Sequence, residues 1–359
     1  MQTPKIINIF FPCIALFGIL QACNTTTKEQ KYLPDVQKIE ANMDIIRFDR
    51  LFFSIDTSRL EADLISLKKQ HPSFTNGYLK TVLGVGNSLQ EPYIVKGYLN
   101  FADAKYTYDT VQKVFNNMAQ VEKELQDLAR HYSYYFPDST PITKAYAYLS
   151  EYHGDRMAQP EDGFVGLPLD MSLGNGYPAY NLLKIPLYDQ RTCNKAHLVA
   201  KAANAVAQSI TARHCQKGGN HLIDQMLYNG KYMYLTDILI PSVADSLKFG
   251  YTSYQMEYCR RGELSLYKHL LKNELFYSGD SKLILKYVNK GPFRPEFDLP
   301  GNSGTWLGYR MVMAFAKFHK NRLKQSGQYN IREIDQMIIA LVMQEIEPQK
   351  FLQVYKAAS

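Results

Sequence analysis

Residues 221–240 read HLIDQMLYNGKYMYLTDILI and are followed by Pro241. Apolar side chains recur every three or four positions through this stretch, a spacing typical of an α-helix. Proline lacks the backbone N–H that a helix interior needs, so we predict that the helix ends before Pro241. The same kind of pattern predicts further helices at residues 196–212, 251–277, 303–323 and 331–345.

Helical signals also dominate the first part of the chain. Ser58 and Glu61 form a capping box ahead of an apolar run that stops before His71-Pro72. Asp109 is predicted to cap a long helix whose apolar residues recur every three or four positions and whose opposite face is polar. The apolar positions of that helix are Val111, Val114, Phe115, Met118, Val121, Leu125 and Leu128.

The middle of the chain has a different pattern. Residues 142–149 (ITKAYAYL) and 163–169 (GFVGLPL) are short β-type segments between turn residues, and we predict them to be strands of a small sheet. The predicted fold class is therefore mainly α with a small β-sheet (α+β). No sharp linker divides the chain, so we predict a single domain over residues 41–359.

Composition excludes several classes of protein. The 359 residues are 46% apolar and 21% charged, which is enough to bury a sizeable core and unlike a disordered chain. A mean hydropathy of -0.30 leaves too little hydrophobicity for a polytopic membrane protein. The net charge of +7 comes from scattered Lys and Arg without basic runs, so no nucleic-acid partner is expected.

The N-terminus has the pattern of a bacterial secretion signal. Lys5 precedes an uncharged stretch that is too short to cross a bilayer core of about 30 Å. The stretch ends in Leu20-Gln21-Ala22-Cys23, which is similar to a lipobox. We therefore predict a lipoprotein signal peptide over residues 1–22, lipidation of Cys23 and a lipid-anchored tether over residues 23–40. Asn24 is not the Asp that retains lipoproteins in an inner membrane, which favours the outer membrane and its periplasmic face.

The remaining cysteines leave the redox state open. Cys193, Cys215 and Cys259 allow one disulfide and one leftover thiol, or no disulfide at all. No Cys-x-x-Cys pair occurs, so neither thiol redox chemistry nor a structural zinc site is expected.

Known catalytic motifs are missing from the sequence. There is no His-Glu-x-x-His, no Gly-x-Ser-x-Gly and no glycine-rich phosphate loop between a strand and a helix. We therefore assign no catalytic residue, metal or cofactor.

Polar and aromatic residues nevertheless cluster inside apolar segments. Two explanations remain open: buried hydrogen-bond networks that fix helices against the sheet, or a tyrosine-lined cleft for a glycan or peptide. The candidate residues are Asp170, Tyr177, Tyr180, Asp224, Lys231, Tyr251, Gln255 and Glu263.

All of these candidates except Glu263 fall within seven blocks that follow the lipobox in order. The blocks are Ile46-Arg47-Phe48-Asp49-Arg50-Leu51-Phe52; Leu169-Asp170 with Leu173-Gly174 and Tyr177-Pro178-x-Tyr180; Leu222-Ile223-Asp224 with Gly230-Lys231; Gly250-Tyr251-Thr252 with Gln255; Tyr277-Ser278; Pro292-Phe293; and Gly304-x-Trp306-Leu307-Gly308. Their order resembles that of the gliding-motility lipoprotein family GldB of Bacteroidota. The resemblance implies an outer-envelope lipoprotein that works with motility and secretion proteins.

The same family is distantly similar to zincin-like peptidases. This similarity implies a metal-binding helix near Ala196–Ala212 and a third ligand near Asn229-Gly230. Ala203-Asn204-Ala205-Val206-Ala207 contains no His. A metal-free, degenerate zincin-like scaffold is therefore expected.

Three functions follow as hypotheses. The first is a non-catalytic scaffold or assembly factor of the gliding and secretion machinery, anchored to the membrane by lipid. The second is a zincin-like or carboxylate-dependent hydrolase of peptide or peptidoglycan that uses Asp170, Asp224 and Glu263. The third is a lipid-anchored glycan-binding module.

Overall fold

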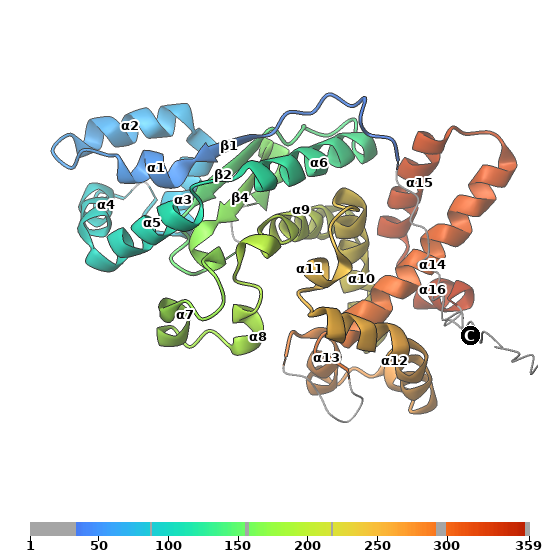
Figure 1. The fold of residues 1–359 in the computed structure, drawn as a ribbon. Helices are drawn as coiled ribbons and strands as arrows, with labels where there is room; N and C mark the ends of the chain where they lie inside the picture. The colour runs from blue at the N-terminus through green and yellow to red at the C-terminus, as the bar shows by residue number, and fades with distance from the viewer. Residues whose placement is uncertain (1–33, 87, 155–157, 217, 292–298, 356–359) are drawn as a thin grey trace, which may run out of the picture. The chain divides into compact units, whose positions relative to one another are not determined.

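The computed structural model describes residues 34–86, 88–154, 158–216, 218–291 and 299–355. Asp35–Ser359 form one compact unit, which is mostly helical with a small sheet (Figure 1), so the predicted fold class is confirmed. The predicted signal peptide, Cys23 and most of the tether lie outside the described residues. Val36, near the end of the predicted tether, is buried in the core.

The sheet contains three parallel strands and a short antiparallel edge strand, in the order β1-β2-β4-β3. Strands β2 (Lys144–Tyr148) and β4 (Phe164–Pro168) confirm the two predicted β segments. Strand β1 (Asp44–Arg47) pairs with β2 and was not predicted, because it contributes only two apolar side chains before a helix begins. The edge strand β3 is Ala158–Gln159.

Side chains of β2 alternate between two cores, as the period of a strand requires. Ala145 and Ala147 face the larger core, whereas Tyr146 and Tyr148 face a smaller, aromatic one. In the aromatic core, Tyr146 stacks on Phe74 with the ring centroids 4.1 Å apart. The N-terminal helices that enclose this core are α1 (Phe48–Phe53), α2 (Leu60–Gln70), α3 (Pro72–Thr81) and α4 (Glu91–Asn100).

Helix α2 is where the sequence predicted a helix, but its start differs. Arg59 is the N-cap residue, and the Ser58 hydroxyl donates to Asp56 at 2.7 Å instead of capping. The predicted capping box at Ser58 is therefore wrong, because Asp56 lies close enough to compete for that hydroxyl.

The predicted long helix that starts at Asp109 is two helices. Asp109 lies inside α5 (Ala102–Val114), and α6 (Ala119–Tyr135) follows after a break. At the break, Phe115 is fully buried and its carbonyl oxygen accepts a hydrogen bond from Arg47 Nη1 at 3.0 Å. The Asn117 side chain then accepts from the backbone N–H of Ala119 at 2.9 Å, which helps to start α6.

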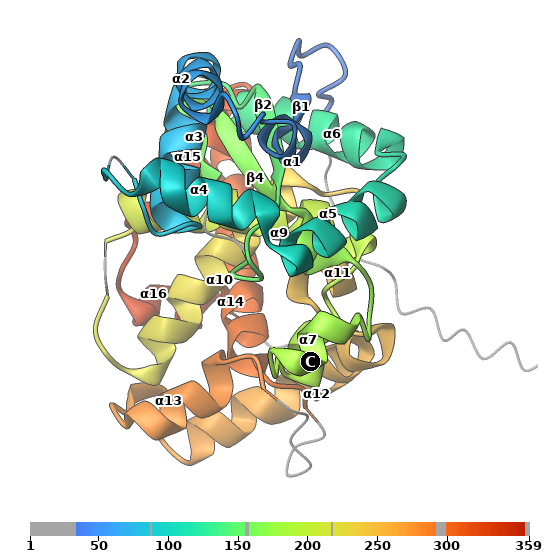
Figure 2. The same cartoon turned by 90° about the vertical axis from the view of Figure 1, so that its left-hand side faces the viewer.

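The larger core is built from helices that the sequence predicted closely. They are α9 (Leu198–His214), α10 (Leu222–Leu239), α14 (Ser303–Ser326) and α15 (Ile331–Gln344). Helix α9 packs on β4, and both views show α14 alongside α10 (Figure 2). The helix predicted over 251–277 is shorter: α12 covers Ser253–Lys272, because Glu274 adopts a left-handed conformation with φ of 54° before a 3-10 turn.

Short helices complete the fold and were not predicted, since each has too few residues for a clear period. They are α7 (Pro178–Leu182), α8 (Leu187–Gln190), α11 (Asp245–Phe249), α13 (Ser281–Val288) and α16 (Pro348–Val354). Among the described residues, no helix combines the length and apolar character that a membrane span requires.

Helices α10 and α14 cross in backbone contact. A Cβ atom added at Gly308 of α14 would lie 1.9 Å from the backbone oxygen of Met226 in α10, and one added at Gly230 of α10 would lie 2.4 Å from the backbone carbon of Gly308. Both distances are far below van der Waals contact, so only glycine fits at either position. The family blocks Gly230-Lys231 and Gly304-x-Trp306-Leu307-Gly308 therefore meet at this crossing.

Candidate functional site

The first group of candidate residues lies where two parallel strands end. Ser150 follows β2 and Asp170 follows β4, so both are at the carboxyl edge of the sheet, where α/β proteins commonly place functional groups. Asp170 Oδ1 accepts hydrogen bonds from the backbone N–H of Ser150 at 2.9 Å and from its hydroxyl at 2.8 Å. Asp170 Oδ2 accepts from the backbone N–H of Tyr152 at 2.9 Å. The carboxylate thus binds the loop that leaves the neighbouring strand.

That loop has an unusual backbone. Glu151 and Tyr152 both have left-handed φ angles, 54° and 58°, which side-chain-bearing residues adopt only when their surroundings enforce it. Burial raises the pKa of Asp170, whereas the hydrogen bonds from Tyr152 and Ser150 oppose that rise. Burial also raises the pKa of the nearby Glu151. The hydrogen bonds to Asp170 therefore help to hold a strained turn.

Tyr180 connects the same cluster to the next segment. Its hydroxyl donates to the backbone oxygen of Asp170 at 2.7 Å and accepts from the backbone N–H of Leu173 at 3.1 Å. The Tyr177 ring lies edge-on to the Tyr180 ring, with centroids 5.3 Å apart. The structure therefore brings together three of the predicted site residues, Asp170, Tyr177 and Tyr180.

The segment that Tyr177 and Tyr180 support is a tight pair of short helices, α7 and α8. The buried Gln190 amide donates to the Asn181 side chain at 2.9 Å and to the Ile185 backbone oxygen at 2.8 Å, which fixes the turn between the helices. We call residues 182–187 of this turn the leucine tip. The side chains of Leu182, Leu183 and Leu187 are exposed there.

Asp224 and Lys231 form a second group on α10. Asp224 is in the first turn and accepts from the backbone N–H of its N-cap residue, His221, at 2.9 Å. Lys231 is buried and donates to the Glu345 backbone oxygen at 2.6 Å and to Cys215 Sγ at 3.3 Å. Both side chains line one cavity of about 20 Å³, which is room for about one water molecule. They share this cavity, but each is held by other partners.

The remaining candidates have partners of their own. The Tyr251 hydroxyl donates to the Gly301 backbone oxygen at 2.9 Å. Gln255 closes the capping box of α12 with Thr252. Glu263 pairs with Arg310 at 2.9 Å and accepts from the Tyr355 hydroxyl at 2.9 Å. The predicted polar residues thus form two groups and three separately bonded residues, and not one site.

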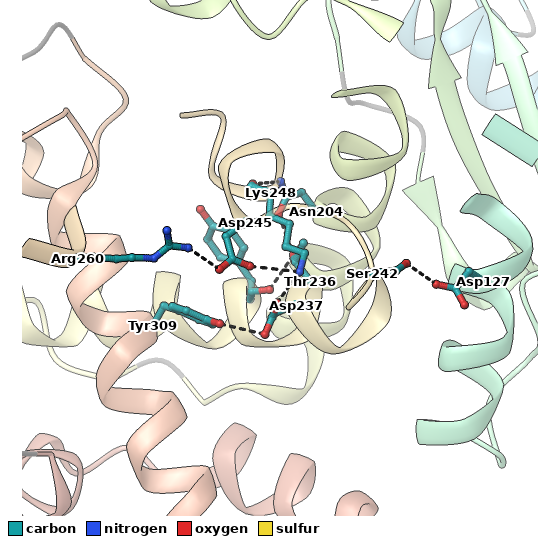
Figure 3. Close-up of polar contacts among 10 residues, drawn as sticks. Asp127, Asn204, Thr236, Asp237, Ser242, Asp245, Lys248, Arg260 and Tyr309 are labelled. Atoms are coloured by element: carbon teal, nitrogen blue, oxygen red, sulfur yellow. Dashed lines mark hydrogen bonds and ion pairs between the residues drawn. The ribbon is translucent and has the colours of Figure 1, made fainter. Parts of the chain in front are cut away.

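A buried charge network was missed by sequence reasoning (Figure 3). Lys248 Nζ lies 2.6 Å from Asp237 Oδ1 and 3.5 Å from Asp245 Oδ1, and the Lys248 side chain is only 1% exposed. The Tyr309 hydroxyl donates to Asp237 Oδ2 at 2.9 Å, and burial raises the pKa of Tyr309. The available signal was a lysine between Leu247 and Phe249, just before the Gly250-Tyr251-Thr252 block.

A zincin-like protein would carry metal-binding side chains on the helix that corresponds to α9. In this chain that helix carries other side chains. In α9, Ala203, Val206 and Ala207 are buried, and Asn204 donates to the Lys248 backbone oxygen at 3.0 Å. At the expected position of the third ligand, Asn229-Gly230, the Asn229 amide donates to the Thr305 hydroxyl at 3.2 Å and Gly230 lies at the helix crossing. Alanine, valine and glycine supply no zinc ligand, and the described residues contain no group of three His, Cys, Asp or Glu placed to hold a metal.

The three cysteines of the folded unit are buried thiols. Cys193, Cys215 and Cys259 form no disulfide within the described residues, and burial raises the pKa of Cys259 to about 12.

A surface groove of about 510 Å³ lies between α10 and α13. Its lining is amide-rich and apolar, without tyrosine: Asn220, Gln225, Asn229, Gly279, Ser281, Ile284, Leu285, Val288 and Asn289. It is therefore not the tyrosine-lined cleft that the sequence left open.

The fold and these contacts define a mostly helical protein with a small sheet, in which the conspicuous polar residues are held by contacts within the fold. A family model described as gliding motility protein GldB matches residues 29–338, and the chain belongs to this family. The resemblance seen in the seven blocks is confirmed. Searches of curated proteins and of solved structures gave no match.

Replacing Asp170 with alanine is expected to lower the free energy of unfolding by about 2–4 kcal/mol, because it leaves the buried N–H groups of Ser150 and Tyr152 without an acceptor. Asp170→Asn keeps one acceptor oxygen and should cost less. Urea denaturation measures both. The exposed Asp138→Ala is the matched control and should change stability by less than about 0.5 kcal/mol. Equal stability of Asp170→Ala and Asp138→Ala would contradict the bracing role.

Proposed function

We propose that the protein is a non-catalytic scaffold or assembly factor of the gliding-motility machinery and its associated secretion apparatus. It is anchored by lipid on Cys23 to the outer membrane, with the folded unit on the periplasmic side. Membership of the GldB family supports the motility context. The lipobox-like Leu20-Gln21-Ala22-Cys23 supports the anchor.

The main support for a non-catalytic role is that the carboxylates proposed for hydrolysis are already bound by hydrogen-bond donors of the protein. Asp170 accepts three hydrogen bonds from the loop after β2. Asp224 closes the first turn of α10, and Glu263 pairs with Arg310 and Tyr355. A general acid or base must reach substrate, whereas these three groups are held by protein donors on different elements. This arrangement favours a bracing role over a hydrolytic one.

The glycan-binding alternative has one observation in its favour. The groove between α10 and α13 presents the neutral amides of Asn220, Gln225, Asn229 and Asn289, which can donate and accept hydrogen bonds to hydroxyl groups. Titration of the protein with cell-wall and surface glycans, compared with an Asn229→Ala variant, tests this function. Saturable binding that the variant loses would support it.

Cross-linking of the natively produced protein in intact envelopes, followed by affinity purification and mass spectrometry, tests the main proposal. Proteins of the gliding or secretion apparatus are expected among the cross-linked partners. Hydrolysis of peptide or peptidoglycan by the purified protein would contradict the proposal, provided that Asp170→Asn removes the activity and leaves the fold intact.

The lipid anchor has a separate test. Cys23→Ala is expected to release the protein from the membrane fraction while its thermal midpoint stays unchanged, because Cys23 lies outside the compact unit. Cys13→Ala alters the other cysteine of the N-terminal segment and is the matched control, which should remain membrane-bound. Membrane fractionation and intact-mass analysis provide the measurements. Unchanged fractionation of Cys23→Ala would contradict anchoring through this residue.

A further inference from the structure

The leucine tip, residues 182–187, is an apolar surface that no function above uses. Leu182 is 82% exposed and Leu187 is 79% exposed, and Leu183 beside them is also exposed. Single exposed leucines are common on protein surfaces, but several on one short turn mark a site of interaction.

The tip is built to hold its shape without a partner. Gln190, which is 4% exposed, donates to both Asn181 and Ile185 across the turn. Lys184 at the turn has a left-handed φ of 55°, a strained conformation that those hydrogen bonds help to hold. The base is fastened to the sheet through Tyr180 and Asp170. The family residues Asp170 and Tyr180 therefore support the display of exposed leucines.

The chemistry around the tip suits a bilayer surface. In the stretch Tyr177–Tyr188 the sole charged residue is Lys184, and it is exposed. The tyrosines at both ends of the stretch are half-buried. This arrangement matches the layering of a membrane interface: the leucines are at the end of the tip, one lysine is beside them and the tyrosines are behind them. There apolar groups enter the acyl region, cations meet phosphates and aromatic rings occupy the headgroup level.

We propose that the leucine tip inserts into the periplasmic leaflet of the outer membrane, the bilayer to which the protein is anchored. This inference rests on the lipid anchor proposed above. From Cys23 to Asp35, where the compact unit begins, the chain can span at most about 40 Å. The tether thus keeps the folded unit close to the lipid, so a small apolar contact is sufficient to orient it.

Quenching by lipids with brominated acyl chains tests the insertion. The wild-type protein has a single tryptophan, Trp306, which is buried and gives the baseline emission. Leu187→Trp places a reporter in the tip, and Leu89→Trp places one at a fully exposed leucine outside it. The natively produced proteins are floated with vesicles of anionic and zwitterionic phospholipid, and the emission of the floated material is recorded. Unchanged thermal midpoints show that both variants fold.

We expect brominated lipid to remove most of the added emission from Leu187→Trp and little from Leu89→Trp. Equal quenching of the two variants, or none in either, would overturn the insertion while the anchor stands. In that case the leucines would be assigned to a protein partner. A chain that does not float contradicts the anchor and, with it, the insertion. The two failures are therefore distinguished by the flotation step.

Discussion

Replacing Gly308 with alanine is expected to lower the free energy of unfolding by at least about 3 kcal/mol. The added Cβ atom would lie 1.9 Å from the backbone oxygen of Met226 and 2.5 Å from its carbonyl carbon. These atoms belong to the backbone of α10, which cannot rotate aside as a flexible side chain could. The helices must separate instead, and the packing of the larger core is lost with them.

Gly97→Ala is the matched control for this prediction. Gly97 is also a helical glycine, in α4, but a Cβ atom there would meet no atom within 4 Å. Alanine has the higher helix propensity, so Gly97→Ala should leave stability unchanged or raise it by about 0.5–1 kcal/mol. Urea denaturation of both variants gives the comparison. A Gly308→Ala protein as stable as Gly97→Ala would show that α10 and α14 are not in backbone contact.

The second large effect is expected at the buried charge network. Lys248→Met should cost about 3–5 kcal/mol, because it leaves the Asp237 carboxylate buried without its ammonium partner. The Tyr309 hydroxyl also donates to that carboxylate, but a neutral hydroxyl cannot neutralise its charge. Adding Asp237→Asn to Lys248→Met removes the uncompensated charge and should restore part of the lost stability. Thermal and urea unfolding measure both effects.

A surface ion pair provides the control for that series. Arg261 Nε lies 2.8 Å from Glu257 Oε1, a distance close to that between Lys248 and Asp237, but both side chains are largely exposed. Arg261→Met should therefore cost no more than about 1 kcal/mol. If Lys248→Met cost as little as Arg261→Met, the buried pair would not be the source of stability that its geometry indicates.

The sequence predicted most of the long helices because their periodicity extends over several turns. Helix α10 matches the predicted 221–240 within a residue at each end. The break at Phe115 was missed because the residue continues the apolar period, whereas the contact made at the break comes from Arg47, which is distant in sequence. Strand β1 and the helices α7 and α8 are too short to produce a period. Such elements depend on tertiary contacts, which a local pattern does not contain.

The contacts of the candidate site residues could likewise be predicted only in part from the sequence. Asp170, Tyr177 and Tyr180 are close in sequence, and the structure brings them together. The buried Lys248 pairs with Asp237 across two helices, and Tyr309 reaches that carboxylate from a third. No spacing rule connects residues so far apart. The sequence showed which polar residues lie in apolar segments, but only the structure showed which residues they contact.

The glycine contact between α10 and α14 also has a mechanical consequence. Two backbones in contact cannot slide along each other without first separating, so we expect the two helices to move as one unit. Helix α10 packs on α9, which packs on β4, while α14 packs on α15 and α16. We therefore expect a force applied to the C-terminal helices to be transmitted to the sheet with little deformation. Under an applied force we expect the folded unit to extend very little.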